Sequence, residues 1–345
     1  MIALVRVLSK RSLINPIEQP TLLVHVTGDR IGDALIKWPI IVALRKALPD
    51  HRLVWLACLR KSVFRGSLAG LASGVIDEVR DYAGVGVSWR EFLRPPLPGK
   101  FDIIIATEPK IRNAILLKRI SHKVFISPAA NFRLSDRKPR SGFRYPKSTF
   151  DQVRCLATLA AGSELDVDTV IDVGDENLML ARDLLPAAGT YLGLAPGSAG
   201  ERKRWPLAHY IELAVAHVKR GRAPVFFLGP EEESMQYEIV QAVPDALFPE
   251  QAASASNHHS PLLTIALAQR LALGVANDAG GGHLLAAGGR PLITLFGRTS
   301  PDKFKPPYGE RIAITAREFG GTDISLIPVA HVAATIDSVL ESEVR

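Results

Sequence analysis

Sulfur is scarce in this chain of 345 residues, which contains two cysteines and three methionines. Cys58 and Cys155 lie far apart and form no Cys-x-x-Cys pair, so neither a disulfide framework nor a zinc–cysteine site is expected. His258 and His259 have no Cys, Asp or Glu at metal-ligand spacing, which favours an ordinary loop. We predict no metal site, and we expect reduced thiols, as in a cytosol.

Long hydrophobic runs are missing as well. No stretch reaches the ~18 apolar residues that a transmembrane helix needs, and the apolar run at residues 1–8 is too short for a signal peptide. Hydrophobic residues nevertheless make up 47% of the chain, which is typical of a globular protein and not of a disordered one. We therefore expect a soluble protein of about two domains, because one domain usually holds ~100–200 residues.

Three common active-site signatures are also absent. The chain has no Gly-x-Gly-x-x-Gly fingerprint, no Walker phosphate loop and no Gly-x-Ser-x-Gly nucleophile elbow. The predicted strand at residues 52–58 ends without the acidic residue that would hold an NAD ribose. A nicotinamide enzyme is therefore disfavoured, and no cofactor is predicted.

Positive charge is in excess, since 42 Lys and Arg residues against 35 Asp and Glu residues give a formal net charge of +7. Such an excess suits a nucleic acid, an anionic membrane face or a phosphorylated substrate. No nucleic-acid partner is predicted, because zinc-finger spacing and RNA-binding aromatic motifs are absent. Residues 131–147, rich in Arg, Lys and Pro, are expected to form an exposed basic loop.

Apolar runs alternate with segments of helical periodicity along the whole chain. Predicted strands fall at residues 21–27, 52–58, 75–80 and 101–106 and, after a looser stretch at 162–189, at 190–195, 223–228, 271–276 and 291–296. Predicted helices fall at residues 33–48, 110–120, 148–161, 206–220, 231–242, 283–287 and 328–344. This alternation indicates parallel sheets covered on both faces, in two α/β halves.

Three loops after predicted strands carry glycines and polar residues, at the strand ends where parallel sheets bind ligands. The first loop, GDRIGD at residues 28–33, allows a tight turn and places Asp33 in the first turn of a helix. Asp33 is either a functional carboxylate or a residue that interacts favourably with the helix dipole.

The second loop, at residues 196–206, reads PGSAGERKRWP and leads into a helix. Backbone N–H groups at a helix start, together with Lys203 and Arg204, form a site suited to a diphosphate. The alternative is a solvated basic loop, because runs of charge usually face water.

The third loop, NDAGGGH at residues 277–283, leaves the backbone bare at three glycines, where a phosphate or sugar could approach. The alternative is a flexible turn in which His283 packs or caps. Carboxylates at residues 231–233 follow another predicted strand, and they either hold ribose hydroxyls or form an acidic first helical turn.

Together these motifs resemble glycosyltransferase family 9, the heptosyltransferases of lipopolysaccharide core synthesis. The matching residues follow the order and spacing of the family from about residue 22 to residue 310. They are Arg30-Ile31-Gly32-Asp33, Pro39, Ala43-Leu44, Pro49, Pro196-Gly197, Lys203-Arg204-Trp205-Pro206, Asn277-Asp278, Gly280, His283, Leu295-Phe296-Gly297, Thr299, Pro301 and Pro307-Tyr308-Gly309. Each motif alone is weak, whereas the set is specific.

The resemblance implies a GT-B fold, in which two Rossmann-like domains face each other across a cleft. Residues 1–170 would bind the acceptor and residues 171–327 the nucleotide sugar, with a C-terminal helix at 328–345 packing back on the first domain. The implied reaction is an inverting, metal-independent transfer of a sugar, expected to be heptose from ADP-heptose, to a lipopolysaccharide core or related glycan. The enzyme would be cytoplasmic and peripheral on the inner face of the bacterial inner membrane, where its acceptor is an anionic lipid-linked glycan.

The resemblance also assigns roles to individual residues. Asp33 matches the proposed catalytic base of the family, and Lys203 matches its phosphate-binding lysine. The other residues expected at the donor are Arg204, Glu231, Asp278, Gly280, Gly281, Gly282 and His283. The basic residues expected at the acceptor, all in the N-terminal half, are Arg30, Arg133, Arg137, Lys138 and Arg140.

The chain departs from the family in the third loop, which usually reads Asp-Thr/Ser-Gly-Pro-x-His. Ala279 replaces the hydroxyl residue of that loop and Gly281 replaces its proline. Further along the chain, Arg298 stands where the family often has a proline after Phe-Gly. The first change removes a side-chain hydrogen bond to the donor, and the second loosens the loop. These departures support one alternative, a non-catalytic protein that binds a sugar nucleotide on the same fold.

Overall fold

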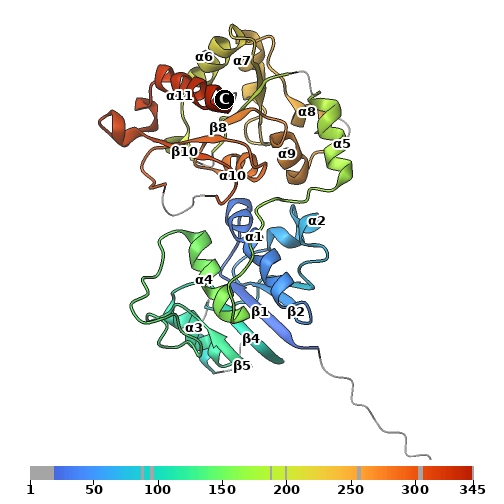
Figure 1. Ribbon diagram of the computed structural model, residues 1–345, viewed down its shortest axis with the longest axis vertical. Coiled ribbons are helices and arrows are strands. Elements are labelled where there is room, and N and C mark those ends of the chain that lie inside the picture. The colour runs from blue at the N-terminus through green and yellow to red at the C-terminus, as the bar shows by residue number, and fades with distance from the viewer. Residues whose placement is uncertain are drawn as a thin grey trace, which may run out of the picture.

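The computed structural model describes residues 19–86, 89–93, 97–186, 189–198, 200–254, 258–301 and 306–343. Residues 1–8, for which the sequence predicts no signal peptide, and Ala199 of the second loop lie outside this part of the chain. Within it, the chain forms two α/β lobes, which lie one above the other in Figure 1.

The N-terminal lobe is built on a parallel sheet in the order β3-β2-β1-β4-β5. Its elements are β1 (Thr21–Val26), α1 (Ile31–Ala47), β2 (Arg52–Ala57), α2 (Ala69–Ala72), β3 (Glu78–Arg80), β4 (Lys100–Ala106), α3 (Ile111–Lys118), β5 (Ser121–Ile126) and α4 (Thr149–Ala161). Side chains of β1 alternate between two cores, with Val24 in the core that contains α1 and Leu23 in the core that contains α3. Helices therefore cover both faces of the sheet, which explains the nearly continuous apolar runs.

The C-terminal lobe repeats this plan with a parallel sheet in the order β10-β9-β8-β6-β7. Its elements are α5 (Asp175–Leu184), β6 (Tyr191–Ala195), α6 (Leu207–Val218), β7 (Ala223–Phe226), α7 (Met235–Ala242), α8 (Pro249–Ser254), α9 (Pro261–Ala268), β8 (Leu273–Asn277), α10 (Gly280–Ala287), β9 (Leu292–Phe296), β10 (Arg311–Thr315) and α11 (Val329–Glu343). The two parallel sheets confirm the predicted α/β class. The strand order changes direction between β1 and β4 and between β6 and β8, and such switch points are where these folds bind ligands.

Several elements have no clear signal in the sequence. The edge strands β5 and β10 are largely half-exposed, so they lack the apolar run that marks a buried strand. The helix α5 lies inside the stretch predicted to be loose, and its one buried residue is Ala181. The helix predicted from residue 231 begins at Met235, because residues 231–234 form a turn.

The C-terminal helix packs differently from the prediction. Instead of returning to the N-terminal lobe, α11 lies on α6 at the far end of the C-terminal lobe (Figure 1). Its apolar face, including Val332 and Ile336, is buried in the core of that lobe, and Asp337 pairs with Arg220 at 2.9 Å. The predicted packing is therefore wrong, while the domain boundary at residue 170, between β5 and β6, stays a prediction.

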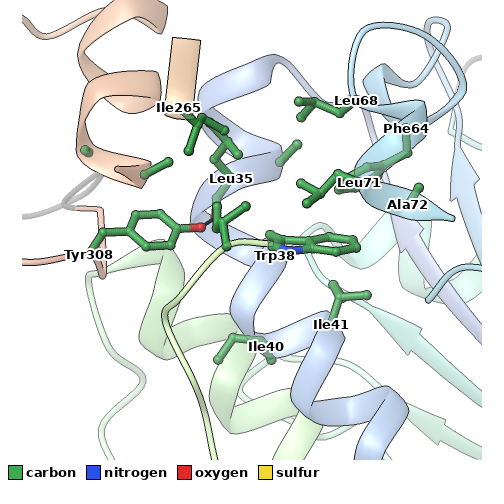
Figure 2. Close-up of a cluster of buried hydrophobic side chains, with 14 of the residues drawn as sticks. Leu35, Trp38, Ile40, Ile41, Phe64, Leu68, Leu71, Ala72, Ile265 and Tyr308 are labelled. Atoms are coloured by element: carbon green, nitrogen blue, oxygen red, sulfur yellow. Dashed lines mark hydrogen bonds between the residues drawn. The ribbon is translucent and has the colours of Figure 1, made fainter. Parts of the chain in front are cut away.

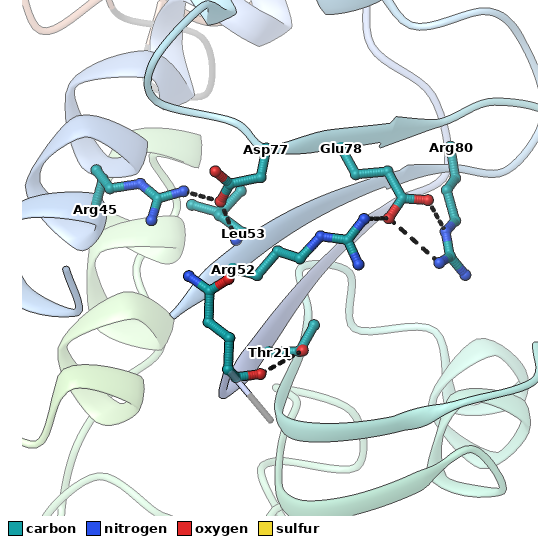
Figure 3. Close-up of polar contacts among 8 residues, drawn as sticks. Thr21, Arg45, Arg52, Leu53, Asp77, Glu78 and Arg80 are labelled. Carbon is teal, nitrogen blue, oxygen red and sulfur yellow. Dashed lines mark hydrogen bonds and ion pairs between the residues drawn. The ribbon is translucent and has the colours of Figure 1, made fainter. Parts of the chain in front are cut away.

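The short edge strand β3 is fastened by charged side chains (Figure 3). Glu78 accepts hydrogen bonds from Arg52 and Arg80, both at 2.6 Å. Asp77 pairs with Arg45 near the end of α1 and accepts a hydrogen bond from the backbone N–H of Leu53 at 2.7 Å. These contacts hold the sheet edge to α1, although each exposed pair alone contributes little to stability.

An apolar core runs across the boundary between the two lobes. Leu35 and Trp38 of α1 share this core with Ile265 of α9, Leu285 of α10 and Tyr308, and Figure 2 shows Tyr308 and Ile265 beside α1. The helix that follows the first loop is thereby held against the helix that follows the third.

His25 of β1 makes stability depend on pH. It is fully buried, and within the described part of the chain neither ring nitrogen has a hydrogen-bond partner. Burial lowers the pKa of His25 from 6.5 to about 4. The folded histidine therefore stays neutral, while the unfolded one takes up a proton below pH 6.5, so its contribution to stability is complete above pH 6.5 and is lost as the pH falls toward 4.

We expect this loss to be ~3 kcal/mol and to disappear in His25→Leu. Urea unfolding of both proteins at pH 7 and pH 4 measures it. An equal loss of stability in the variant would show that other groups cause the acid sensitivity.

Candidate active site

The first and third loops meet where the lobes touch. A Cβ atom on Gly32 would lie 2.4 Å from Cδ2 of His283, so the backbone at the start of α1 rests directly on the imidazole. Only glycine allows this approach. The two loops follow β1 and β8, which lie at the switch points of their sheets, so the sequence-predicted ligand sites of the two lobes are brought together.

Asp29, which the sequence analysis does not single out, anchors the first loop. Its buried carboxylate accepts hydrogen bonds from Nε1 of Trp55 at 3.0 Å and from Oγ of Ser62 at 2.7 Å. Its neighbour in the loop, Asp33, is only half-buried at the start of α1. Asp29 therefore has a structural role, whereas the carboxylate of Asp33 is available to a ligand.

Asp33 and Arg30 line a cavity of about 260 Å³. The other lining residues are Thr27, Gly28, Leu59, Arg60 and Glu108. Arg60 and Glu108 follow β2 and β4, the two strands that flank β1. The sequence could have indicated both as polar residues just beyond predicted strands, but it does not show which strands are neighbours.

Lys37 lies one turn after Asp33 in α1 and is only 8% exposed. Its burial lowers the pKa of the ammonium, while the carboxylates of Asp33, Asp29 and Glu108 act in the opposite direction. A buried lysine therefore lies among three carboxylates at this end of the lobe. Sequence reasoning missed Lys37, because a lysine in a helix usually faces water.

On the opposite lobe, Lys203 and Asp278 join the second loop to the third. Nζ of Lys203 lies 3.3 Å from Oδ2 of Asp278, and the same oxygen accepts a hydrogen bond from Oγ1 of Thr299 at 2.8 Å. Lys203 remains half-exposed, whereas Asp278 is mostly buried. The lysine is therefore held at the surface of the site, where it can meet a second anion.

Asn277 fixes the second loop in place. Its Oδ1 accepts a hydrogen bond from the backbone N–H of Trp205 at 3.0 Å, and its Nδ2 donates one to the carbonyl of Pro196 at 2.8 Å. Trp205 is itself buried and donates from Nε1 to the carbonyl of Ile327 at 3.0 Å. One asparagine and one tryptophan thus position the cationic loop that contains Lys203 and Arg204.

Arg204 and Glu232 form a pair behind the second loop. Nη2 of Arg204 lies 3.6 Å from Oε1 of Glu232 and donates a hydrogen bond to the carbonyl of Ser198 at 2.9 Å. Burial raises the pKa of Glu232, although Arg204 acts to lower it. A Cβ on Gly197 would lie 2.8 Å from the Glu232 carboxyl carbon, so the glycine lets the loop pass over this side chain.

A cavity of about 500 Å³ lies beside this pair. Both Glu231, which is exposed, and Glu232, which is buried, line it. The sequence favours Glu231 and gives no reason to select Glu232, because the burial of Glu232 depends on Gly197 of the distant second loop as well as on the nearby Gly229. The remaining lining residues are Ile31, Ala195, Gly197, Ser198, Phe227, Gly229, Pro230, Glu250, His259, Pro261, Thr264, Ala279, Gly280, Gly281 and Leu284.

His259, predicted to be an ordinary loop residue, takes part in a polar cluster in this cavity. Its Nε2 lies 3.5 Å from Oε1 of the buried Glu250, which also accepts a hydrogen bond from Thr264. The hydrogen bond with Glu250 raises the pKa of His259. The cavity wall therefore presents both an acidic group and an imidazole.

His283 lies among charges from both lobes. Burial lowers its pKa, Asp278 and Asp33 act to raise it, and Lys203 and Arg311 add to the lowering. The charges that act on this one imidazole therefore come from both lobes, Asp33 from the first and Asp278, Lys203 and Arg311 from the second. Gly282 and His283 also line a separate cavity of about 250 Å³ with Asp278 and Arg311.

The predicted acceptor residues are not equivalent. Arg30 borders the Asp33 cavity, and Arg133, Lys138 and Arg140 are exposed on the basic loop. Arg137 instead donates from Nη1 to the carbonyls of Leu159 and Ala160, at 2.9 and 2.7 Å. It therefore satisfies the C-terminal carbonyls of α4, a structural role.

The described residues contain no helix that is long and apolar enough to cross a membrane. The same part of the chain shows no group of three or more His, Cys, Asp or Glu side chains placed to hold a metal ion.

Two Rossmann-like lobes, with their predicted ligand-binding loops face to face, define the GT-B class. The fold is similar to that of a family 9 glycosyltransferase from Veillonella parvula, with a TM-score of 0.68 and 20% identity over 94% of this chain and 98% of the other. It is also similar to the structure of the ADP-heptose lipopolysaccharide heptosyltransferase II of Escherichia coli, with a TM-score of 0.63 and 19% identity over 94% and 100% of the two chains.

The family model of glycosyltransferase family 9 (heptosyltransferase) matches residues 92–322. The chain belongs to this family.

Curated relatives agree with this assignment. The lipooligosaccharide heptosyltransferase 2 of Haemophilus influenzae is 36% identical over 126 residues, which are 36% of this chain and 35% of that protein. The lipopolysaccharide heptosyltransferase 2 of Salmonella typhimurium is 30% identical over 42% of this chain and 41% of its own. The chain thus spans about two fifths of the length of these relatives, whereas it matches 97% of an Escherichia coli lipopolysaccharide heptosyltransferase 3 at 25% identity.

Proposed function

We propose that this protein is an inverting glycosyltransferase that moves heptose from ADP-heptose to a lipopolysaccharide core or related glycan. One observation carries the proposal: Gly32, the neighbour of Asp33 in α1, lies against His283 of the other lobe, and the loop of His283 contains Asp278, which pairs with Lys203. The loop with a carboxylate suited to accept a proton therefore meets the loops with a cation suited to bind a diphosphate. Membership of the family supports the same reaction.

The nucleotide of the donor fits the C-terminal lobe. The cavity of about 500 Å³ would hold the nucleoside, with Glu231 and Glu232 near the ribose hydroxyls. The diphosphate would lie between Lys203 and the start of α10. Ala279 occupies the N-cap of α10 and has no hydroxyl to bond the first backbone N–H groups, which leaves them available to a phosphate.

The chemistry divides between the lobes. Asp33 accepts the proton of the acceptor hydroxyl while the hydroxyl oxygen forms a bond to the anomeric carbon. The bond from that carbon to the diphosphate oxygen breaks on the opposite side, and ADP leaves with the electron pair, so the anomeric configuration inverts. Lys203, Arg204 and the N–H groups of α10 stabilise the negative charge that develops on the leaving diphosphate.

A screen of nucleotide sugars by native mass spectrometry tests the donor assignment. We expect ADP-heptose to be retained at concentrations at which UDP- and GDP-sugars are not. If a UDP- or GDP-sugar is retained in preference, that sugar nucleotide and not ADP-heptose would be the donor. The proposed division of roles between the two lobes would still hold.

The basic N-terminal half would serve an anionic, lipid-linked acceptor. Arg30 and Arg60 border the Asp33 cavity, and five cations of the basic loop are exposed, namely Arg133, Lys138, Arg140, Arg144 and Lys147. In this proposal the enzyme works in the cytoplasm, peripheral to the inner face of the inner membrane, where a basic residue near anionic lipid contributes ~1 kcal/mol.

Neutralising three of the five exposed cations of the basic loop tests this part of the proposal. In a triple variant (Arg133→Gln, Lys138→Gln, Arg140→Gln) we expect affinity for anionic liposomes or for the acceptor to fall about 10- to 100-fold. Nucleotide binding should stay within twofold, because the donor site lies in the other lobe. Liposome sedimentation and calorimetry measure the two affinities.

The matched control removes the same charge from exposed positions of the C-terminal lobe, Arg182, Lys219 and Arg317. Equal losses in both triple variants would mean that net charge, and not the basic loop, drives the interaction.

The second candidate function is a non-catalytic binder of a sugar nucleotide. It is favoured by the same Ala279 and Gly281, which depart from the family pattern in the donor loop. Turnover of the donor, by transfer or by hydrolysis, distinguishes the two candidates, because a binding protein would release ADP-heptose unchanged.

A further inference from the structure

The helix α1, which begins beside the proposed base, contains a proline in its interior. Proline has no backbone N–H, so Pro39 cannot donate the helical hydrogen bond to the carbonyl of residue 35, four positions earlier. The helix nevertheless continues through Pro39 to Ala47. The carbonyl of Leu35 is therefore an acceptor that the helix itself leaves without its usual donor.

A tyrosine of the other lobe supplies the missing donor. The hydroxyl of Tyr308 donates a hydrogen bond to the carbonyl of Leu35, and Figure 2 shows its ring reaching α1 from the C-terminal lobe. Tyr308 is only 1% exposed, and burial raises its pKa, so that the hydroxyl keeps the proton it donates. This bond crosses the lobe boundary in a region without competing water, where hydrogen bonds are strongest.

The segment that presents Tyr308 is fixed to α10. At Gly309, where φ is +50°, a Cβ would lie 2.2 Å from the carbonyl oxygen of Gly289, so the two backbones are in direct contact just beyond the end of α10. His283, at the other end of this helix, rests on Gly32. The helix α10 is thus connected to α1 at two points. It touches Gly32 directly through His283, and it is linked to Leu35 through Tyr308. These two points lie on either side of Asp33 in the sequence.

We propose that Tyr308 is a positioning residue, which uses the carbonyl freed by Pro39 to fix the helix that carries Asp33 against the donor-binding lobe. This inference rests on the proposed transferase function. Two contacts determine both the position and the rotation of α1 on α10, and a base must lie within hydrogen-bond reach of the proton it accepts. A mobile α1 would still allow the donor to bind, but it would misplace Asp33.

A double-mutant cycle tests the pairing of Tyr308 with Pro39. Tyr308→Phe removes only the hydroxyl, and we expect kcat to fall about three- to tenfold, the range of one hydrogen bond, with the affinity for ADP-heptose within twofold. Pro39→Ala returns an N–H that can bond the Leu35 carbonyl within the helix. In that background Tyr308→Phe should change kcat less than twofold.

Tyr191→Phe is the matched control. This tyrosine is also buried, and its hydroxyl donates to the carbonyl of Pro186 at 2.8 Å inside the C-terminal lobe. We expect it to lower stability without changing kcat. Equal effects of Tyr308→Phe with and without Pro39, or a loss of kcat in the control as large as in Tyr308→Phe, would overturn the inference.

Hydrogen exchange separates this inference from the proposed function, because it needs no substrate. Tyr308→Phe should speed amide exchange in residues 31–38 of α1 and leave β1 unchanged, and Pro39→Ala should reverse much of the effect. Unchanged exchange in an active enzyme would contradict the positioning role alone. If Tyr308→Phe speeds exchange but the wild-type protein transfers no sugar, the contact of Tyr308 with α1 would be supported and the proposed transferase function would be contradicted.

Discussion

Asp33→Asn is expected to lower the rate of sugar transfer by about 10²- to 10⁴-fold, the usual contribution of a general base. The amide keeps the size of the carboxylate but cannot accept the proton of the acceptor hydroxyl. The affinity for ADP-heptose should stay within about twofold, because the proposed donor site is built by the other lobe. Single-turnover kinetics and calorimetry measure the two quantities separately.

The control for this experiment is Asp50→Asn, an exposed carboxylate just beyond the other end of α1. It should transfer sugar at the wild-type rate. Full activity in Asp33→Asn would remove Asp33 as the base and would direct attention to Glu108, which lines the same cavity.

The second large effect is expected at Lys203, whose replacement by alanine should weaken nucleotide binding about 10- to 100-fold, as is usual for a charge-assisted contact. Two causes act together. The diphosphate loses a cation, and Asp278, which lies 3.3 Å from Lys203, loses the charge that compensates it. The remaining carboxylate then repels the phosphates. Calorimetric titration with ADP measures the change.

Lys219→Ala is the control for Lys203, since this lysine lies exposed at the C-terminal end of α6 in the same lobe. It should bind ADP as tightly as the wild type. Unchanged ADP affinity in Lys203→Ala would show that the diphosphate binds elsewhere, and the second loop would then be a solvated basic loop.

The sequence predicts the parts of this site that depend on local order along the chain. A loop after a buried strand lies at the carboxyl end of a parallel sheet whatever the strand order, so Asp33, Lys203 and His283 could be identified as candidates. Their meeting across two lobes follows from the family resemblance and not from the pattern of residues. The resemblance implies only that the two domains face each other, and the contact of Gly32 with His283 is a finding of the structure.

Other features depend on contacts between distant segments, which periodicity does not reveal. Glu108 and Arg60 reach the Asp33 cavity because their strands flank β1. Glu232 is buried because two glycines, Gly197 and Gly229, leave room for its carboxylate.

The apolar face of α11 predicts that this helix is buried but does not show against which lobe, and here the prediction was wrong. The role of Tyr308 is hidden for a similar reason. Its partner is the carbonyl of Leu35, which Pro39 frees and which lies 273 positions earlier in the chain.

The central claim is that the facing loops transfer heptose from ADP-heptose. The most direct test incubates the purified protein with ADP-heptose and a heptose-deficient lipopolysaccharide core, and follows the acceptor by mass spectrometry. We predict that the acceptor gains the mass of one heptose residue, that one ADP is released for each transfer, and that the new linkage has the anomeric configuration opposite to that of the donor. An acceptor of unchanged mass, with ADP-heptose bound but recovered intact, would contradict the claim and identify a binding protein.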